Sequence, residues 1–319
     1  MKMLFTYLIT IIMLLLQSSA NAQITDTELV LSTPTGDLSG SLMQSTEHAV
    51  GHKSMPKVVA LIIAGSGPTD RNGNNPQMTN NSLKMLAQGL AEQGIASLRY
   101  DKRGVAKSAK AGLSEIDLRF DTYIEDAQLW VEYIHRQHPN VPIVIVGHSE
   151  GALIGAAAAQ HPRVAKYVSI AGAGQPIDVI LREQLKSQPN IVLSSATPIL
   201  DSLLKGEKVE NVPPFLMALF RPSVQPYMIS WFAYDPAKQI AKIDKPVLIV
   251  QGTTDIQVST NNAQILASAA PMAQISIIEG MNHILKSAEA DRAANMATYT
   301  QADLPLEPKL IDIIANFVK

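Results

Sequence analysis

Residues 143–159 have the sequence IVIVGHSEGALIGAAAA. The first four are apolar and β-branched, as in a strand that is buried on both faces of a sheet. The pentapeptide GHSEG, residues 147–151, comes next, and an alanine-rich run that favours a helix follows it directly. A strand, a sharp turn and a helix in direct succession are typical of an α/β sheet that exposes a serine at the turn.

Apolar runs of similar length on either side of this segment indicate further buried, parallel strands. They are residues 58–63, 96–100, 164–171, 247–250 and 275–278. Helix-like stretches alternate with them near residues 80–93, 119–138, 150–160, 260–270 and 305–318. Two short alternating segments, residues 28–32 and 38–42, flank a Pro-Thr-Gly turn and predict an antiparallel hairpin. We therefore predict an α/β fold: a mostly parallel sheet with an N-terminal antiparallel hairpin and helices on both faces.

Residues 174–236 separate two of these strands by far more than a usual connection. The segment contains helix-like patches at 177–185, 196–204 and 214–220, several prolines and many bulky apolar residues. We predict a mostly helical cap inserted over the C-terminal edge of the sheet, which leaves residues 23–173 and 237–319 as the core. The aromatic residues of the cap suit either ordinary packing against the core or the lining of an acyl pocket.

Ser149 is the candidate nucleophile, because the turn between strand and helix exposes its side chain at the sheet edge. Glycines at 147 and 151 suit a turn that holds the serine in a strained backbone conformation. The N-terminus of the following helix favours negative charge beside it. A serine at this place is also a good helix N-cap, which is the structural alternative. His148 is expected to project away from the serine and is not the candidate base.

A serine needs a base to remove its proton, and an imidazole oriented by a carboxylate is the usual arrangement. With an elbow of this kind, the acid and then the base follow the serine along the chain. His161 ends the helix after the elbow, so His283 is the remaining histidine, in the loop after strand 275–278. Asp255 follows strand 247–250 and is the candidate acid, with Glu279 as the alternative. A loop histidine and a helix-capping aspartate are the structural alternatives.

Acyl transfer places negative charge on the carbonyl oxygen, so two backbone N–H groups should face it. One is expected from Glu150, the residue after the nucleophile. The other is expected from the glycine-rich residues 64–68, where we favour the N–H of Ser66 over that of Gly65. A simple tight connection after strand 58–63 would also explain these glycines.

Four segments of the chain resemble the α/β-hydrolase superfamily and, more narrowly, its bacterial carboxylesterase-like and S33 aminopeptidase-like hydrolases. They are GSGPTDRNG at 65–73, RYDKRGVAKS at 99–108, the elbow, and the loops of Asp255 and His283. The resemblance implies an inserted cap between the sixth and seventh main strands, which matches residues 174–236.

The chain departs from the family pattern at two positions. Ala64 stands where relatives often have a histidine before the oxyanion loop, which should leave the backbone donors intact. Ala106 replaces a frequent glycine in the second segment. The acidic and basic residues at 70–71 and 101–103 are expected to support loops beside the active site.

The first residues predict a signal peptide over residues 1–22, with Lys2, an apolar run at 8–16 and an Ala-x-Ala ending. The mature chain would then begin near Gln23 and be exported, periplasmic or secreted, with no stable membrane anchor. An uncleaved anchor is the alternative, although the apolar run is shorter than the ~20 residues of a spanning helix. The chain has 26 Lys and Arg against 28 Asp and Glu and no basic run, so nucleic acid is not an expected partner. It has no cysteine, which excludes disulfides, cysteine catalysis and thiolate metal sites.

Together these features predict a serine hydrolase that cleaves small or short-acyl carboxylic esters through an acyl-enzyme on Ser149, without a metal or organic cofactor. An aminopeptidase-like or other amide or lactone hydrolase of the same fold is the nearest alternative. The cap holds acidic and basic residues in similar numbers, without an acidic cluster that would suit a substrate ammonium. A non-catalytic ligand-binding protein of this fold is the alternative from another class, and a complete triad argues against it.

Overall fold

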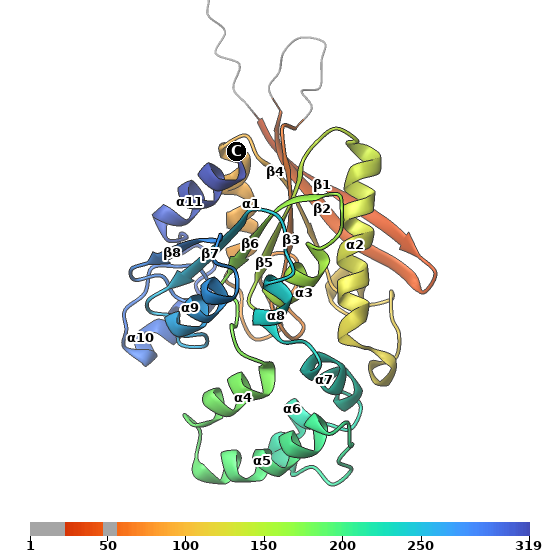
Figure 1. Cartoon of the computed structure of the whole chain (residues 1–319), viewed down its shortest axis with the longest axis vertical. Helices are drawn as coiled ribbons and strands as arrows, with labels where there is room; N and C mark the ends of the chain where they lie inside the picture. The colour runs from red at the N-terminus through yellow and green to blue at the C-terminus, as the bar shows by residue number, and fades with distance from the viewer. Residues whose placement is uncertain (1–22, 47–55) are drawn as a thin grey trace, which may run out of the picture.

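A single eight-stranded sheet forms the centre of the computed structural model, which describes residues 23–46 and 56–319 (Figure 1). The strand order is β1-β2-β4-β3-β5-β6-β7-β8. The first two strands and β4 pair antiparallel, and every pair from β4 to β8 is parallel. The strands are β1 Gln23–Thr33, β2 Gly36–Thr46, β3 Val59–Ile63, β4 Ala96–Tyr100, β5 Ile143–His148, β6 Val164–Ile170, β7 Val247–Gly252 and β8 Gln274–Ile278. The predicted fold class is confirmed, and the proposed signal peptide lies outside the described residues.

Helices cover both faces of the sheet (Figure 1). The apolar faces of α1 and α11 pack on one side, and those of α2, α3, α8 and α9 pack on the other. The bounds are α1 Ser82–Glu92, α2 Phe120–Gln137, α3 Glu150–Ala158, α8 Pro236–Ile240, α9 Thr260–Ala269, α10 Arg292–Ala297 and α11 Pro308–Val318. The alternating arrangement places the carboxyl ends of the parallel strands along one edge, where ligands bind in sheets of this kind.

The apolar composition of the central strands accounts for their buried position in the sheet. Every residue of β3, β5 and β7 is buried, and their apolar side chains are divided between the two layers of the core. Pairing in register from Val59↔Ile143 to Ile63↔Gly147 makes β3 and β5 end side by side. The loops that follow these two strands are therefore neighbours at the sheet edge.

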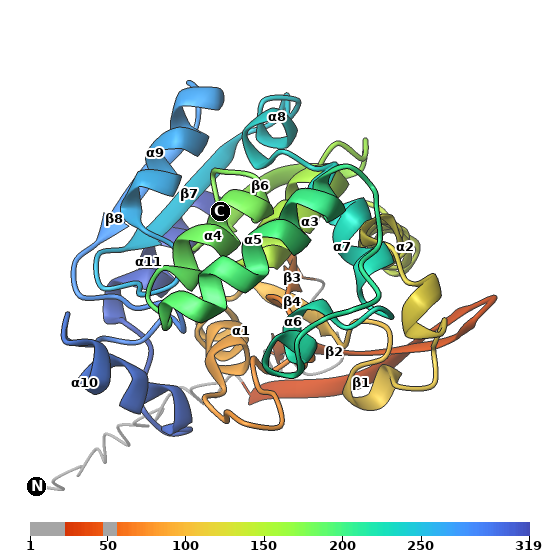
Figure 2. The same ribbon diagram turned by 90° about the horizontal axis from the view of Figure 1, so that it is seen from below.

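Four helices connect β6 to α8 and lie beyond the carboxyl ends of the strands (Figures 1 and 2). They are α4 Ile177–Leu185, α5 Asn190–Leu204, α6 Met217–Phe220 and α7 Gln225–Phe232. Their own small apolar cluster includes Leu200, Phe220 and Met228. The helix predicted at 196–204 begins earlier, at Asn190, and continues through Pro198, while α7, α8 and α10 were not predicted. Short 3-10 turns lie at Ala106–Ser108, Glu115–Asp117, Pro214–Leu216 and Thr298–Thr300.

Among the described residues, no helix is both long enough and apolar enough to cross a membrane.

Candidate active site

Ser149 lies where β5 ends and α3 begins. Its backbone has φ 56° and ψ −120°, a strained conformation for a residue other than glycine, as the turn predicted. A Cβ on Gly147 would lie 2.2 Å from the carbonyl oxygen of Gly151, and one on Gly151 would lie 2.3 Å from that of Ile63. Both glycines are therefore required by the close approach of backbone around the serine. The side chain of Ser149 is only partly buried, so a substrate can reach it.

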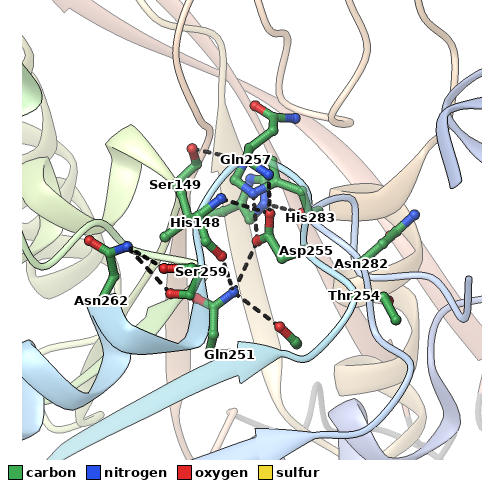
Figure 3. A network of polar contacts seen from close by, with 12 residues as sticks. His148, Ser149, Gln251, Thr254, Asp255, Gln257, Ser259, Asn262, Asn282 and His283 are labelled. Atoms are coloured by element: carbon green, nitrogen blue, oxygen red, sulfur yellow. Dashed lines mark hydrogen bonds and ion pairs between the residues drawn. The ribbon is translucent and has the colours of Figure 1, made fainter. Parts of the chain in front are cut away.

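His283 lies between Ser149 and Asp255 (Figure 3). Its Nε2 is 3.1 Å from Ser149 Oγ, and its Nδ1 is 2.8 Å from Asp255 Oδ2. When the proton is on Nδ1, the ring donates to the carboxylate and Nε2 accepts the serine O–H, which is the arrangement a general base needs. The three loops follow β5, β7 and β8, so the structure brings together the three residues that chain order suggested.

The alternatives for base and acid lie elsewhere. Glu279 is exposed and forms no hydrogen bond to His283 within the described residues. His161 lies 3.2 Å from Glu132 on another part of the surface. Asp255 is thus the carboxylate that orients the imidazole.

Asp255 is held by four hydrogen bonds although its side chain is 1% exposed. Oδ1 accepts from the backbone N–H groups of Gln257 and Val258, and Oδ2 accepts from Gln251 and His283. Burial acts to raise the pKa of this carboxyl, but the charge and hydrogen bond of His283 and the two N–H donors outweigh it and lower the pKa. Asp255 therefore remains ionised and can stabilise an imidazolium.

The two residues expected to supply oxyanion donors lie beside the serine. Ser66 follows β3, and a Cβ added to its neighbour Gly65 would be 3.2 Å from Ser149 Cβ. Glu150 is the first residue of α3. Among the described residues, neither backbone N–H has a hydrogen-bond acceptor. Both residues line one cavity together with Ser149, as two free donors for an oxyanion should.

That cavity has a volume of about 420 Å³ and lies between the sheet edge and helices α4, α6 and α7. Its wall on the helical side is mainly apolar and includes Ile180, Leu219, Met228 and Trp231. Such a pocket suits an apolar group next to the reacting carbonyl. Within residues 23–46 and 56–319, no three His, Asp or Glu side chains are grouped as metal ligands would be.

Comparisons with known proteins agree with this fold. Residues 78–215 match the model of the family described as serine aminopeptidase, S33. The chain superposes on Est1E from Butyrivibrio proteoclasticus with a TM-score of 0.55 at 16% identity, covering 92% of this chain and 99% of that one. The esterase Pf2001 of Pyrococcus furiosus gives 0.56 at 14% identity, covering 93% and 91%. The chain therefore has the fold of the α/β-hydrolases.

A curated relative of this chain is the esterase EstD of Thermotoga maritima. The two sequences are 26% identical over 239 residues, which make up 74% of this chain. The match covers 56% of EstD, so the chain spans about half the length of this relative.

Two side chains with no predicted role support the arrangement of Ser149, Asp255 and His283. His148 does not contact Ser149 Oγ; its Nε2 lies 2.8 Å from the backbone carbonyl of His283, to which Nε2–H donates. Burial, together with the nearby His283 ring, lowers the pKa of His148 to about 4, so it is neutral at pH 7. Gln251 is buried and donates to Asp255 and to the Val258 carbonyl. The contact of His148 joins residues 135 positions apart, which no local sequence pattern could reveal.

The charged residues at 70–71 and 101–103 do support loops beside the site, with partners other than their sequence neighbours. Arg71 pairs with Asp101 through Nη2 at 2.8 Å, and Arg103 pairs with Asp126 at 2.6 Å. Asp70 accepts hydrogen bonds from backbone N–H groups of its own turn. These pairs fix the loops after β3 and β4, which carry Ser66 and Lys102.

Proposed function

We propose that this chain is an exported serine hydrolase that cleaves carboxylic esters with small or short acyl groups. The observation that carries the proposal is the hydrogen-bonded series Asp255, His283 and Ser149 at the wall of an apolar cavity. The names of the esterases EstD, Est1E and Pf2001 support an ester as the substrate.

In the proposed mechanism, Nε2 of His283 takes the proton of Ser149 as Oγ attacks the ester carbonyl. The N–H groups of Ser66 and Glu150 donate to the oxyanion of the tetrahedral intermediate. Collapse expels the alcohol, which receives the proton from His283 and leaves an acyl-enzyme. Water, deprotonated by the same imidazole, then attacks the acyl-enzyme and releases the acid. Asp255 keeps the ring oriented and stabilises its positive charge throughout.

The test is hydrolysis of p-nitrophenyl acetate and butyrate by the purified chain and by Ser149→Ala. We expect kcat to fall by at least about 10⁴-fold in the variant, because nothing replaces the nucleophile. Ser194→Ala, at an exposed serine of α5, is the matched control and should keep wild-type activity. A fluorophosphonate probe should label the wild type and the control but not Ser149→Ala. Labelling elsewhere in the chain would refute the assignment, and an unlabelled wild type would favour a ligand-binding protein.

Peptidase activity is the second candidate, because the matching family model is described as serine aminopeptidase. An aminopeptidase needs a free carboxylate for the substrate ammonium. Glu150, the acidic residue that lines the cavity, is paired with Lys102, and nearby Glu115 is paired with Arg221. We therefore expect aminoacyl p-nitroanilides to be cleaved far more slowly than p-nitrophenyl butyrate, and faster cleavage of the anilides would reverse the order of the two functions.

Export is proposed from the pattern of residues 1–22. The mass of the protein purified from the periplasmic or culture fraction should match a chain that starts near Gln23. A full-length mass in the membrane fraction would instead indicate an uncleaved anchor.

A further inference from the structure

A buried ammonium joins the two loops that carry the expected oxyanion donors. Lys102 follows β4, and its side chain is 1% exposed. Its Nζ donates to the carbonyl oxygen of Gly65 at 2.6 Å and to the carboxylate of Glu150 at 2.8 Å. The same Nζ lies 5.0 Å from the centre of the Tyr123 ring, a favourable position for a cation. Lys102 therefore connects three separate segments immediately behind the nucleophile.

The bond to Gly65 has a geometric consequence for Ser66. The carbonyl of Gly65 and the N–H of Ser66 belong to one planar peptide group, in which they point in opposite directions. When Lys102 holds the carbonyl on its side, the N–H must face the other way. Hydrogen bonding of the carbonyl to a cation also polarises the peptide and makes its N–H a stronger donor.

The bond to Glu150 controls charge at the second donor. The carboxylate of Glu150 is 2% exposed and lies on the residue whose backbone N–H is the other expected donor. One of its oxygens accepts from Lys102, and the other accepts from the hydroxyl of Tyr227 on α7. An unpaired carboxylate here would oppose the negative charge that develops on the substrate, because the site is poorly screened.

We propose that Lys102 is a positioning residue for the oxyanion site, which holds the Gly65–Ser66 peptide with its N–H toward the cavity. This inference rests on the proposed function of Ser149. Lys102 does not line the cavity around the serine. Its contribution should therefore appear in the transition state and not in binding of the ester.

The decisive variant is Lys102→Met combined with Glu150→Gln. It removes the ion pair without leaving a buried charge, and neutral replacements of buried pairs commonly preserve the fold. We expect kcat for p-nitrophenyl butyrate to fall about 10- to 100-fold with KM changed by less than about 3-fold, since removal of a whole oxyanion donor costs about 10²- to 10³-fold. Glu150→Gln alone keeps Lys102 on Gly65 and should lose less. Lys107→Met, at an exposed lysine of the same loop, is the matched control and should behave as wild type.

Inhibition by a boronic acid gives a second readout, because its tetrahedral adduct with serine places an oxygen in the oxyanion site. Its inhibition constant should rise in the double variant by about the factor by which kcat falls, whereas a general loss of packing would raise KM as well. Wild-type kcat in the double variant would overturn the proposal, since Lys102 would then act only by neutralising Glu150.

The two proposals can fail separately. If the wild type hydrolyses no ester, the esterase assignment fails, but the rate at which a fluorophosphonate labels Ser149 still reports on the oxyanion site. A slower rate in the double variant would then support the role of Lys102, and equal rates would overturn it.

Discussion

The sheet core and the helical segment α4–α7 contribute different parts of the candidate site. Ser149, Asp255 and His283 all follow core strands, and two of those strands, β5 and β7, are paired on both sides and buried along their length. The opposite wall of the cavity comes from helices that share one small apolar cluster and leave residues such as Ile191 and Phe215 exposed. Regions with fewer buried contacts open more readily than a paired sheet. The core should therefore set the rate for every ester, and the helical segment should set which ester fits.

The first test of this division is Asp255→Asn, which has the largest expected effect. The amide keeps the shape of the side chain but cannot stabilise the imidazolium, and it favours the wrong tautomer of His283. We expect kcat to fall about 10³- to 10⁴-fold for esters of every acyl length, measured with p-nitrophenyl acetate, butyrate and hexanoate. Glu279→Gln removes the same charge in the neighbouring loop and should have no effect. A large loss with Glu279→Gln instead would move the acid to that residue.

A second test concerns the pH dependence of core stability. The pKa of His148 is about 4 in the folded chain against 6.5 for an ordinary histidine, mainly because of burial. As the pH falls, His148 is therefore protonated in the unfolded chain before it is protonated in the folded chain. The free energy of unfolding should fall by about 3 kcal/mol as the pH drops from 6.5 to 4. Above pH 6.5 this contribution is fully present.

The comparison variant is His148→Gln, which retains an N–H donor for the His283 carbonyl but does not titrate. Urea unfolding at several pH values between 4 and 7 should give a smaller decrease for the variant than for the wild type. The lowered pKa of Asp255 adds a loss of stability in acid that both proteins share. Parallel curves for the two proteins would show that His148 is not the titrating group.

A third test asks whether the helical segment sets acyl preference. Ile180 on α4 is buried and lines the cavity, so Ile180→Phe should reduce its volume. We expect kcat/KM for the hexanoate ester to fall about 10-fold relative to the acetate ester, the order of one or two methylene contacts. Ile191→Phe makes the same change at a site on α5 that is 62% exposed and should leave the ratio unchanged. An unchanged ratio in Ile180→Phe would place the acyl group outside this cavity.

The same two regions differ in how well the sequence predicted them. Each of the eight predicted strands is present. The central strands β3, β5 and β7 were easy to predict because burial on both faces demands a continuous apolar run. The helical segment has shorter elements, and prolines at 189 and 198 obscured the first turns of α5. Helix α7 begins at Gln225-Pro226 and has no long apolar period. Pattern alone was therefore a weaker guide where burial is partial.

Within the site, chain order and elimination were sufficient to select the residues that the structure brings together. The supporting contacts were beyond the reach of that method. Lys102 forms an ion pair with Glu150, which is 48 positions away in the sequence. His148 forms a hydrogen bond with His283, which is 135 positions away. Nothing in local spacing encodes such pairs, since they arise only when neighbouring strand ends are aligned in register.

The smallest expected effect concerns backbone strain, which the core contains at more than one place. Ser149 and Ala106 both have positive φ, 56° and 43°, but Ala106 is exposed and lines no part of the cavity. Glycine has no Cβ and therefore no steric penalty in the left-handed region, which stabilises the folded chain. It also increases the entropy of the unfolded chain, which acts against that gain. Ala106→Gly should therefore raise the free energy of unfolding by up to about 1 kcal/mol without changing kcat. Ala109→Gly, at an exposed alanine with φ −55°, should lower it by about 0.5–1 kcal/mol. A loss of stability in both variants would mean that the loop has relaxed around Ala106. The positive φ of Ala106 would then store no strain, in contrast to the expectation for Ser149.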